Sequence, residues 1–155
     1  RLFATCRSPQ RAPELQAAVA HSAQAGAVLK CDVDDSASIE AFGAQMAQAL
    51  EGAPLDALIN NAGISSSNHP IDPILSTTAA EMTAVLHTNV VGTVLVTQAA
   101  LPLLRASGGL KRIVNLSSQL ASIVHSRPHS NRLHRTLPPT LKPPALAVTW
   151  TRTLL

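Results

Sequence analysis

The sequence predicts an α/β fold in which helices cover both faces of a doubly wound parallel sheet. Short apolar runs of strand length alternate four times with longer segments in which apolar residues recur at helical spacing. The 155 residues include two Phe, one Trp and no Tyr, so alanine, valine and leucine must build the interior. Small aliphatic side chains suit helices packed on a parallel sheet better than a β-sandwich.

The first strand and the first helix are predicted near the start of the chain. Residues 2–6 are an apolar run that ends at an Arg-Ser-Pro sequence, which indicates a strand followed by a turn. Residues 10–24 are rich in alanine, and Leu15 and Val19 stand four apart, so a helix is predicted there. Residues 27–31 are the second predicted strand.

The second helix and the third strand follow. Asp34, Asp35 or Ser36 can cap the helix, because a side-chain oxygen there accepts a hydrogen bond from a free N–H of the first turn. Four apolar residues recur at helical spacing: Ile39, Phe42, Met46 and Leu50. Residues 55–59 are the third predicted strand.

A long helix is predicted from about residue 78 to residue 106. Thr78 and Glu81 match the capping-box pattern, in which each side chain bonds to the backbone N–H of the other. The helix carries more apolar residues than one buried face needs, among them Val90, Val91, Val94, Leu95, Ala99 and Leu103. Residues 111–116 are the fourth predicted strand.

Charge and hydropathy argue against two classes of partner. Residues 1–81 carry nine acids and four bases, whereas residues 82–155 carry eight bases and no acid. These bases follow no nucleic-acid-binding motif and have no aromatic residues between them, so we expect no nucleic-acid partner. The longest apolar stretch, residues 90–104, is interrupted by polar residues and a proline and is too short to cross a bilayer, so we expect no membrane partner.

The two cysteines, Cys6 and Cys31, lie in strand-like runs. Two cysteines so placed do not indicate a disulfide framework, and we predict buried free thiols. Free thiols are typical of a reducing compartment, so a cytoplasmic location is expected. No metal site is expected.

Residues of the kinds that bind ligands follow each predicted strand in turn. Arg7 ends the first strand, Asp32 and Val33 the second, residues 60–63 the third and residues 117–118 the fourth. Each of these alone is ordinary loop chemistry: a cap, a turn or a polar terminator. Because the carboxyl ends of parallel strands meet at one edge of the sheet, the series together predicts a ligand site there.

Three runs of sequence carry a resemblance to a known family. They are Asn60-Asn61-Ala62-Gly63, Thr88-Asn89-Val90-Val91-Gly92 and Arg112-Ile113-Val114-Asn115-Leu116-Ser117-Ser118. In this order and spacing, residues 1–123 resemble the short-chain dehydrogenase/reductase family. Two more runs resemble its carbonyl-reductase-like or C-factor-like branch: Thr5-Cys6-Arg7-Ser8-Pro9 and Ala100-Leu101-Pro102-Leu103-Leu104-Arg105. The resemblance implies a Rossmann-type fold and an oxidoreductase that interconverts a carbonyl and an alcohol.

The resemblance also implies a nicotinamide dinucleotide, and the residue types favour NADP(H) over NAD(H). An acidic residue at the end of the strand that leads from the pyrophosphate site would repel a 2′-phosphate. This chain has Arg7 and Ser8 at that place, and a guanidinium pairs with phosphate through charge-assisted hydrogen bonds. The alternative is a surface arginine at a strand end.

Five further residues are implied to hold the cofactor. Asp32 and Val33 would line the adenine pocket, where the carboxylate meets the exocyclic amine and Val33 packs on the ring. Asn60, Ala62 and Gly63 would hold the backbone against the cofactor, since small residues allow a close approach.

For catalysis, the resemblance implies that Ser118 donates a hydrogen bond to the substrate oxygen and that Asn89 helps hold a water in the proton path. The alternative for Asn89 is a polar residue that locally bends the helix. Lys142 is the only lysine after Lys111 and is the candidate for the family's lysine. The family's catalytic tyrosine has no counterpart, because the chain has no Tyr and the residue four before Lys142 is Pro138.

The sequence departs from the family in a second place. The glycine-rich turn and first strand, whose backbone would hold the pyrophosphate, are expected before Arg1 and are missing. We therefore expect an incomplete sheet in which residues 3–4 and 58–59 face gaps. A second alignment of the end of the chain puts Thr140 and Pro144 at the tyrosine and lysine positions.

The chain is thus predicted to have three segments. Residues 1–123 are a partial dinucleotide-binding domain, residues 124–144 an irregular segment rich in Pro, His and Arg, and residues 145–155 the start of a helix. We expect an NADP(H)-dependent oxidoreductase for a small-molecule carbonyl or alcohol that is inactive in this form. An intact form would be a homodimer built on the long helix. The alternative is a non-catalytic, degenerate nucleotide-binding or partner-binding module.

Overall fold

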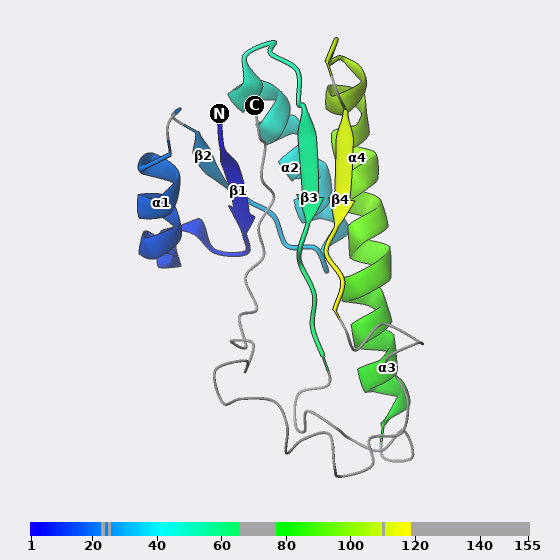
Figure 1. The fold of residues 1–155 in the computed structure, drawn as a ribbon. Coiled ribbons are helices and arrows are strands. Elements are labelled where there is room, and N and C mark those ends of the chain that lie inside the picture. The colour runs from blue at the N-terminus through cyan, green and yellow to red at the C-terminus, as the bar shows by residue number, and fades with distance from the viewer. Residues whose placement is uncertain (23, 25, 66–76, 110, 119–155) are drawn as a thin grey trace, which may run out of the picture.

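The computed structural model describes residues 1–22, 24, 26–65, 77–109 and 111–118 (Figure 1). The strands are β1 (Phe3–Cys6), β2 (Ala27–Lys30), β3 (Ala57–Asn60) and β4 (Arg112–Asn115). The helices are the 3-10 helix η1 (Pro9–Arg11), α1 (Pro13–Ala20), α2 (Ser36–Leu50), α3 (Ala79–Leu86), the π-helix η2 (His87–Gly92) and α4 (Thr93–Arg105). The predicted segments 124–144 and 145–155, with Lys142, lie outside the described residues.

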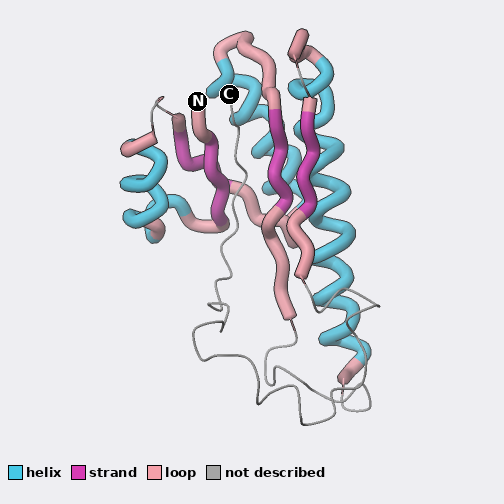
Figure 2. The backbone as a smooth tube through the Cα atoms, viewed as in Figure 1, coloured by secondary structure: helices cyan, strands magenta, loops and turns pink. Residues whose placement is uncertain are grey.

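Both pairs of strands are parallel, which confirms the predicted strand direction. β1 pairs with β2, and β3 pairs with β4 so that Asn60 stands opposite Asn115. Among the described residues the pairs form two separate two-stranded sheets instead of one continuous sheet (Figure 2). In Figure 1 the strands lie in the order β2, β1, β3, β4, and β1 and β3 do not pair with each other, as expected of a doubly wound sheet without its central first strand.

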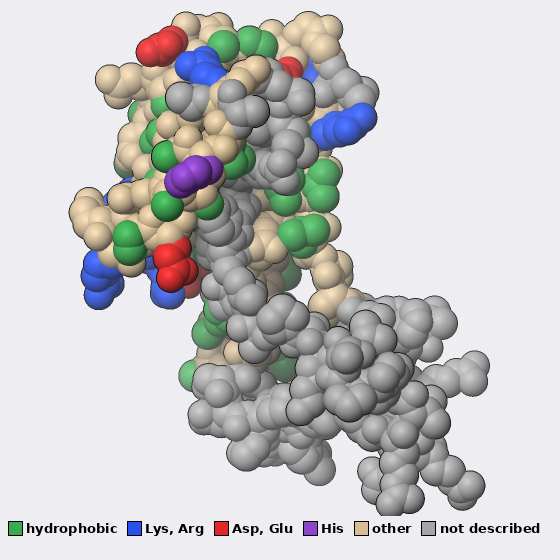
Figure 3. Space-filling view, turned by 60° about the vertical axis from the view of Figure 1, so that its left-hand side comes forward, with side chains coloured by type: hydrophobic (Ala, Val, Ile, Leu, Met, Phe, Trp, Pro, Cys, Tyr) green, Lys and Arg blue, Asp and Glu red, His purple; other side chains and the backbone are tan. Residues whose placement is uncertain are grey.

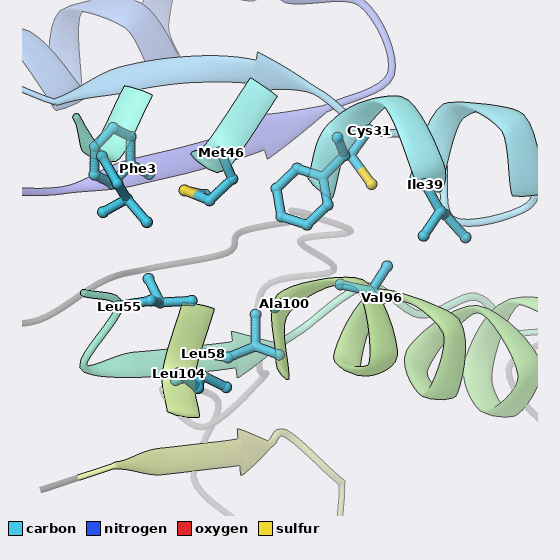
Figure 4. Packing of buried hydrophobic residues seen from close by; sticks show 11 residues of the cluster. Phe3, Cys31, Ile39, Met46, Leu55, Leu58, Val96, Ala100 and Leu104 are labelled. Atoms are coloured by element: carbon cyan, nitrogen blue, oxygen red, sulfur yellow. The ribbon is translucent and has the colours of Figure 1, made fainter. Parts of the chain in front are cut away.

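The main hydrophobic core fills the space between the strands and the two helices α2 and α4, which pack against each other (Figure 4). β1, β3 and both helices contribute to it through Phe3, Phe42, Met46, Leu58, Ala100 and Leu104. A smaller cluster on the opposite face of β1 joins Ala4 to Leu15 and Val19 of α1. Because successive strand residues point to opposite faces, β1 has helices on both sides, as a doubly wound fold requires.

The expected gaps beside residues 3–4 and 58–59 do not expose these side chains. Phe3 is 2% exposed, and Ala4 and Leu58 are fully buried. The prediction concerned the backbone edges within the sheet plane, and β1 and β3 indeed do not pair with each other. These side chains point out of that plane into the two clusters and are therefore buried.

The helix predicted for residues 10–24 is shorter, since α1 runs only from Pro13 to Ala20. Proline lacks an N–H and suits the first position of a helix, so Pro13 begins α1 and Pro9 begins the separate turn η1. The other predicted boundaries agree with the structure to within about two residues.

Two predicted caps are confirmed. The Asp35 carboxylate accepts a hydrogen bond from Ala37 N at 3.0 Å and caps α2. At the start of α3, Thr78 Oγ1 accepts from Glu81 N at 3.2 Å while Glu81 Oε2 accepts from Thr78 N at 2.8 Å, which completes the capping box. The backbone and hydroxyl of Thr78 lower the pKa of Glu81 by bonding to its carboxylate.

α3, η2 and α4 follow one another without a break over the 27 residues Ala79–Arg105. By length and composition alone this helix could cross a membrane, and its most apolar window has a mean hydropathy of 1.4. The prediction that the apolar stretch is too short to cross a bilayer rested on residues 90–104 alone and therefore understated the length of this helix. Val96, Ala100 and Leu104 of the same helix are nevertheless buried in the main core, so one face of the helix belongs to the fold.

Candidate functional site

A polar groove of about 750 Å³ lies at the carboxyl ends of β1 and β2. Its walls hold three bases and two acids, and its lining consists of Cys6, Arg7, Ser8, Arg11, Ala12, Lys30, Asp32 and Asp35. Basic and acidic side chains lie close together at the left edge of Figure 3, about halfway down. The structure thus brings together Arg7, Ser8 and Asp32, as the sequence predicted for the carboxyl edge of the sheet.

Two bases in this groove were missed from the sequence. Arg11 belongs to η1 and donates from Nη2 to Ser8 Oγ at 3.3 Å, and Lys30 ends β2 beside Cys6 of β1. The spacing of four between Arg7 and Arg11 was the available signal for the first. No sequence signal indicated Lys30, because only the pairing of β1 with β2 brings this residue to the groove.

The loop after β2 is held by its own hydrogen bonds. Asp32 N donates to Ser38 Oγ at 2.9 Å, and Asp32 Oδ1 accepts from Asp34 N at 3.1 Å. The second bond closes a turn through the Asp32 side chain, and aspartate commonly forms such turns. The prediction that Asp34 caps α2 was wrong, because its carboxylate instead accepts from Thr88 Oγ1 at 2.6 Å.

Asn60 binds neighbouring elements with its side chain. Its Nδ2 donates to Asn115 Oδ1 at 2.8 Å and to Thr97 Oγ1 at 3.0 Å, and its carbonyl accepts from Leu116 N at 2.9 Å. These bonds tie β3 to β4 and α4, and the residue is 8% exposed. The Asn60 side chain therefore faces α4, and Ala62 and Gly63 continue the chain from the end of β3 toward the surface.

Asn89 lies in the π-helix η2 and clamps the loop after β3. Its Oδ1 accepts from Ile64 N and its Nδ2 donates to Ile64 O, both at 2.8 Å. Its own carbonyl accepts from Thr93 Oγ1 at 3.0 Å. Gly63 adjoins this clamp, because a Cβ built on it would lie 3.3 Å from Asn89 Oδ1. A π-helix often marks a functional position in a longer helix, and this one places Asn89 against that loop.

Ser118 is an exposed residue three positions beyond the end of β4. β3 and β4 are neighbours in parallel register, so their carboxyl ends lie at the same edge of the sheet (Figure 1). Counted from the paired residues Asn60 and Asn115, the position of Ser118 after β4 thus corresponds to that of Gly63 after β3. Within the described ranges, no group of three or more His, Cys, Asp or Glu side chains is arranged to hold a metal ion.

The two cysteines differ in their surroundings. Cys31 is buried in the main core, and burial raises the pKa of its thiol to about 12. Cys6 lies on the opposite face of the sheet, against the α1 cluster, and is only partly buried. The prediction of free thiols is confirmed for both residues, and that of full burial only for Cys31.

Comparison with known proteins supports one family throughout. The model of the short chain dehydrogenase family matches residues 1–128. The chain is 39% identical over 95 residues to a 3-amino-tetrahydro-pyrrolizinone reductase of Xenorhabdus hominickii, a match that covers 61% of this chain and 31% of the relative. It is 34% identical over 119 residues to the uncharacterized oxidoreductase YusZ of Bacillus subtilis, covering 76% of this chain and 40% of the relative.

Solved structures similar to this chain include two carbonyl reductases. The NADPH-bound carbonyl reductase from chicken fatty liver matches with a TM-score of 0.68 and 36% identity, over 79% of this chain and 48% of that one. The carbonyl reductase Sniffer of D. melanogaster matches with a TM-score of 0.70 and 26% identity, over 81% and 53%. The chain spans about a third to a half of the length of these relatives. It belongs to the short-chain dehydrogenase/reductase family and is a carbonyl-reductase-like member of it.

Proposed function

We propose that the described domain binds the adenosine end of NADP(H) in an oxidoreductase that interconverts a carbonyl and an alcohol. The observation that carries the proposal is the groove at the ends of β1 and β2, whose lining includes Arg7, Arg11 and Lys30 together with Ser8. Three cations and a hydroxyl in one groove suit a phosphate monoester, and guanidinium groups bind its oxygens through charge-assisted hydrogen bonds. Asp32 in the same groove supplies an acceptor for the amine of an adenine ring.

The proposal is tested with a fragment that carries only this part of the dinucleotide. Adenosine 2′-monophosphate should bind the 155-residue chain more tightly than adenosine 5′-monophosphate, as measured by isothermal titration calorimetry. Arg11→Ala should weaken that binding about five- to tenfold, because it removes one charge-assisted contact at a partly solvated site. Equal affinity for the two nucleotides would refute the assignment of the phosphate.

A matched control separates local contacts from net charge. Arg105 is an exposed arginine in the last turn of α4, at the end of the molecule away from the groove (Figure 1). Arg105→Ala removes the same charge and should leave the affinity for adenosine 2′-monophosphate unchanged. A loss equal to that of Arg11→Ala would attribute the effect to the overall field of the protein.

We also propose that these 155 residues alone do not turn over a substrate, because they contain no Tyr to act as the proton donor. When bound, the nicotinamide supplies or accepts the hydride. Ser118 would hold the substrate oxygen, but a general acid adds about 10²–10⁴-fold, and the sequence has no tyrosine to act as one. A chain extended by a glycine-rich strand and turn and given a Tyr-x-x-x-Lys segment should consume NADPH, and should lose that activity on Ser118→Ala.

The missing tyrosine also favours a second candidate function. A non-catalytic module that binds a nucleotide or a protein partner needs the groove but no proton donor. It predicts binding of adenosine 2′-monophosphate without any NADPH consumption, even in the extended chain. Activity in the extended chain would exclude this second candidate.

We propose in addition that an intact form is a homodimer built on the long helix. Met82, Leu86, Val90 and Val94 recur every four residues on α3, η2 and α4, and each is between 45% and 52% exposed. Such a stripe of apolar side chains is typical of a helix that packs against another helix. Val90→Glu should shift the protein to monomers in sedimentation velocity, and an unchanged sedimentation coefficient would contradict the proposal.

A further inference from the structure

η2 is bonded to the loop after β2 through a buried threonine. Thr88 is 4% exposed, and its Oγ1 donates to Asp34 Oδ1 at 2.6 Å, between residues 54 positions apart in the sequence. A short hydrogen bond from a hydroxyl to a carboxylate is among the stronger neutral-to-charged contacts in proteins. This bond therefore fixes the position of Asp34 relative to η2.

Asp34 in turn is bonded to Asp32, which lines the groove. Its backbone N–H donates to Asp32 Oδ1 at 3.1 Å, so the orientation of the Asp32 carboxylate depends on where Asp34 lies. The imidazole Nε2 of His87 lies 3.3 Å from the carbonyl oxygen of Asp34 and supports the same residue from η2. Gly92, at the other end of η2, approaches Val33 so closely that a Cβ on it would lie 2.5 Å from the Val33 carbonyl oxygen.

The same six-residue segment also holds the second loop at this edge of the sheet. Asn89 follows Thr88 directly and bonds to both the N–H and the carbonyl of Ile64, after β3. Adjacent residues of η2 thus hold the loop after β2 and the loop after β3. The spacing between these loops is set by the helix, and neither loop contributes to the sheet at that point.

We propose that Thr88 is a positioning residue for recognition of the adenine base: its bond to Asp34 orients the Asp32 carboxylate toward the exocyclic amine. The inference rests on the proposed function, since it concerns the groove that would hold the adenosine end of NADP(H). Thr88 is buried and acts through Asp34 and Asp32, without touching the nucleotide.

The test compares two nucleotides whose bases differ on the edge that would face Asp32. Adenosine 2′-monophosphate carries the exocyclic amine beside an unprotonated N1, and inosine 2′-monophosphate carries a carbonyl oxygen beside an N1–H. The 155-residue chain should prefer the adenosine compound, because an oxygen there would face the Asp32 carboxylate. Thr88→Val should reduce the affinity for adenosine 2′-monophosphate about tenfold, the effect of one lost hydrogen bond to a charged group, and change that for inosine 2′-monophosphate little.

Three variants support the comparison. Thr88→Ser keeps the hydroxyl and should restore the preference for adenine. Thr83→Val makes the same hydroxyl-to-methyl change at an exposed position of α3 and should leave both affinities unchanged. Asp34→Asn keeps an acceptor oxygen without the charge and should give a smaller loss than Thr88→Val, which provides a measurement even if Thr88→Val unfolds.

The outcomes distinguish this inference from the proposed function. If the unaltered chain binds neither nucleotide, the proposed function fails and the inference fails with it. If the chain prefers adenine and both Thr88→Val and Asp34→Asn keep that preference, only the inference is overturned. If Thr88→Val and Thr88→Ser lose both nucleotides equally, Thr88 has a structural role and the inference is again overturned.

Discussion

Replacing Gly92 with alanine is expected to push the start of α4 away from the loop that follows β2. An added Cβ would lie 2.5 Å from the Val33 carbonyl oxygen and 3.1 Å from Val33 Cβ. Ordinary contacts begin near 3.4 Å, so the loop or the helix must move by roughly 1 Å. The obstacle is backbone whose neighbours are bonded to Ser38 and Thr88, and it cannot rotate away as a flexible side chain would.

The change in the free energy of unfolding on Gly92→Ala follows from two opposing effects. Overpacking of this kind costs about 1–3 kcal/mol, whereas alanine is favoured over glycine within a helix by up to about 1 kcal/mol. We therefore expect Gly92→Ala to lower the free energy of unfolding by about 1–2 kcal/mol. We also expect weaker binding of adenosine 2′-monophosphate, because Val33 adjoins Asp32 in the groove loop.

Gly43 provides the matched control. It lies in the middle of α2, and a Cβ there would meet Ala99 Cβ at 3.5 Å, an ordinary contact. Gly43→Ala should therefore raise the free energy of unfolding by about 0.5–1 kcal/mol, since only the helix preference changes. Urea unfolding followed by far-UV circular dichroism measures both variants. A stabilised Gly92→Ala, or a Gly43→Ala destabilised as much as Gly92→Ala, would refute the reasoning.

Four further predictions concern the scaffold and its titratable groups. Asn60→Ala should destabilise the chain by about 1–3 kcal/mol in urea unfolding, because its bonding partners on β4 and α4 are left unpaired; an unchanged midpoint would contradict this. In the folded protein a thiol reagent should label Cys6 and not Cys31, whose pKa is raised to about 12 by burial, and equal labelling rates would show that Cys31 is accessible. Thr78→Ala should cost about 1 kcal/mol by removing a helix cap, as judged by the same unfolding assay. The pKa of Glu81 is lowered from 4.5 in the folded state, so its contribution to stability should be complete above pH 4.5 and lost as the pH falls below it. The stability of Thr78→Ala should lack this dependence on pH.

The site was predicted from the sequence as far as single strands and their ends allow. Arg7 and Asp32 follow apolar runs, and the structure places both in one groove because the two runs pair in parallel. Asn89 was proposed as a site residue from the family resemblance of its run of sequence, and the structure shows it bonded to Ile64. Its partner Ile64 was not, because the clamp joins residues 25 positions apart and leaves no periodic signal.

The sequence by itself determined the alternation of strands and helices, the helix caps and the family, since these depend on local spacing and on short runs of particular residues. Only the tertiary structure decided how these elements are joined. It brought Lys30 into the groove and made Asp34 the partner of Thr88 instead of a helix cap. Those outcomes depend on which backbone edges find a neighbour and which side chains meet across more than fifty residues, and such contacts exist only once the chain has packed.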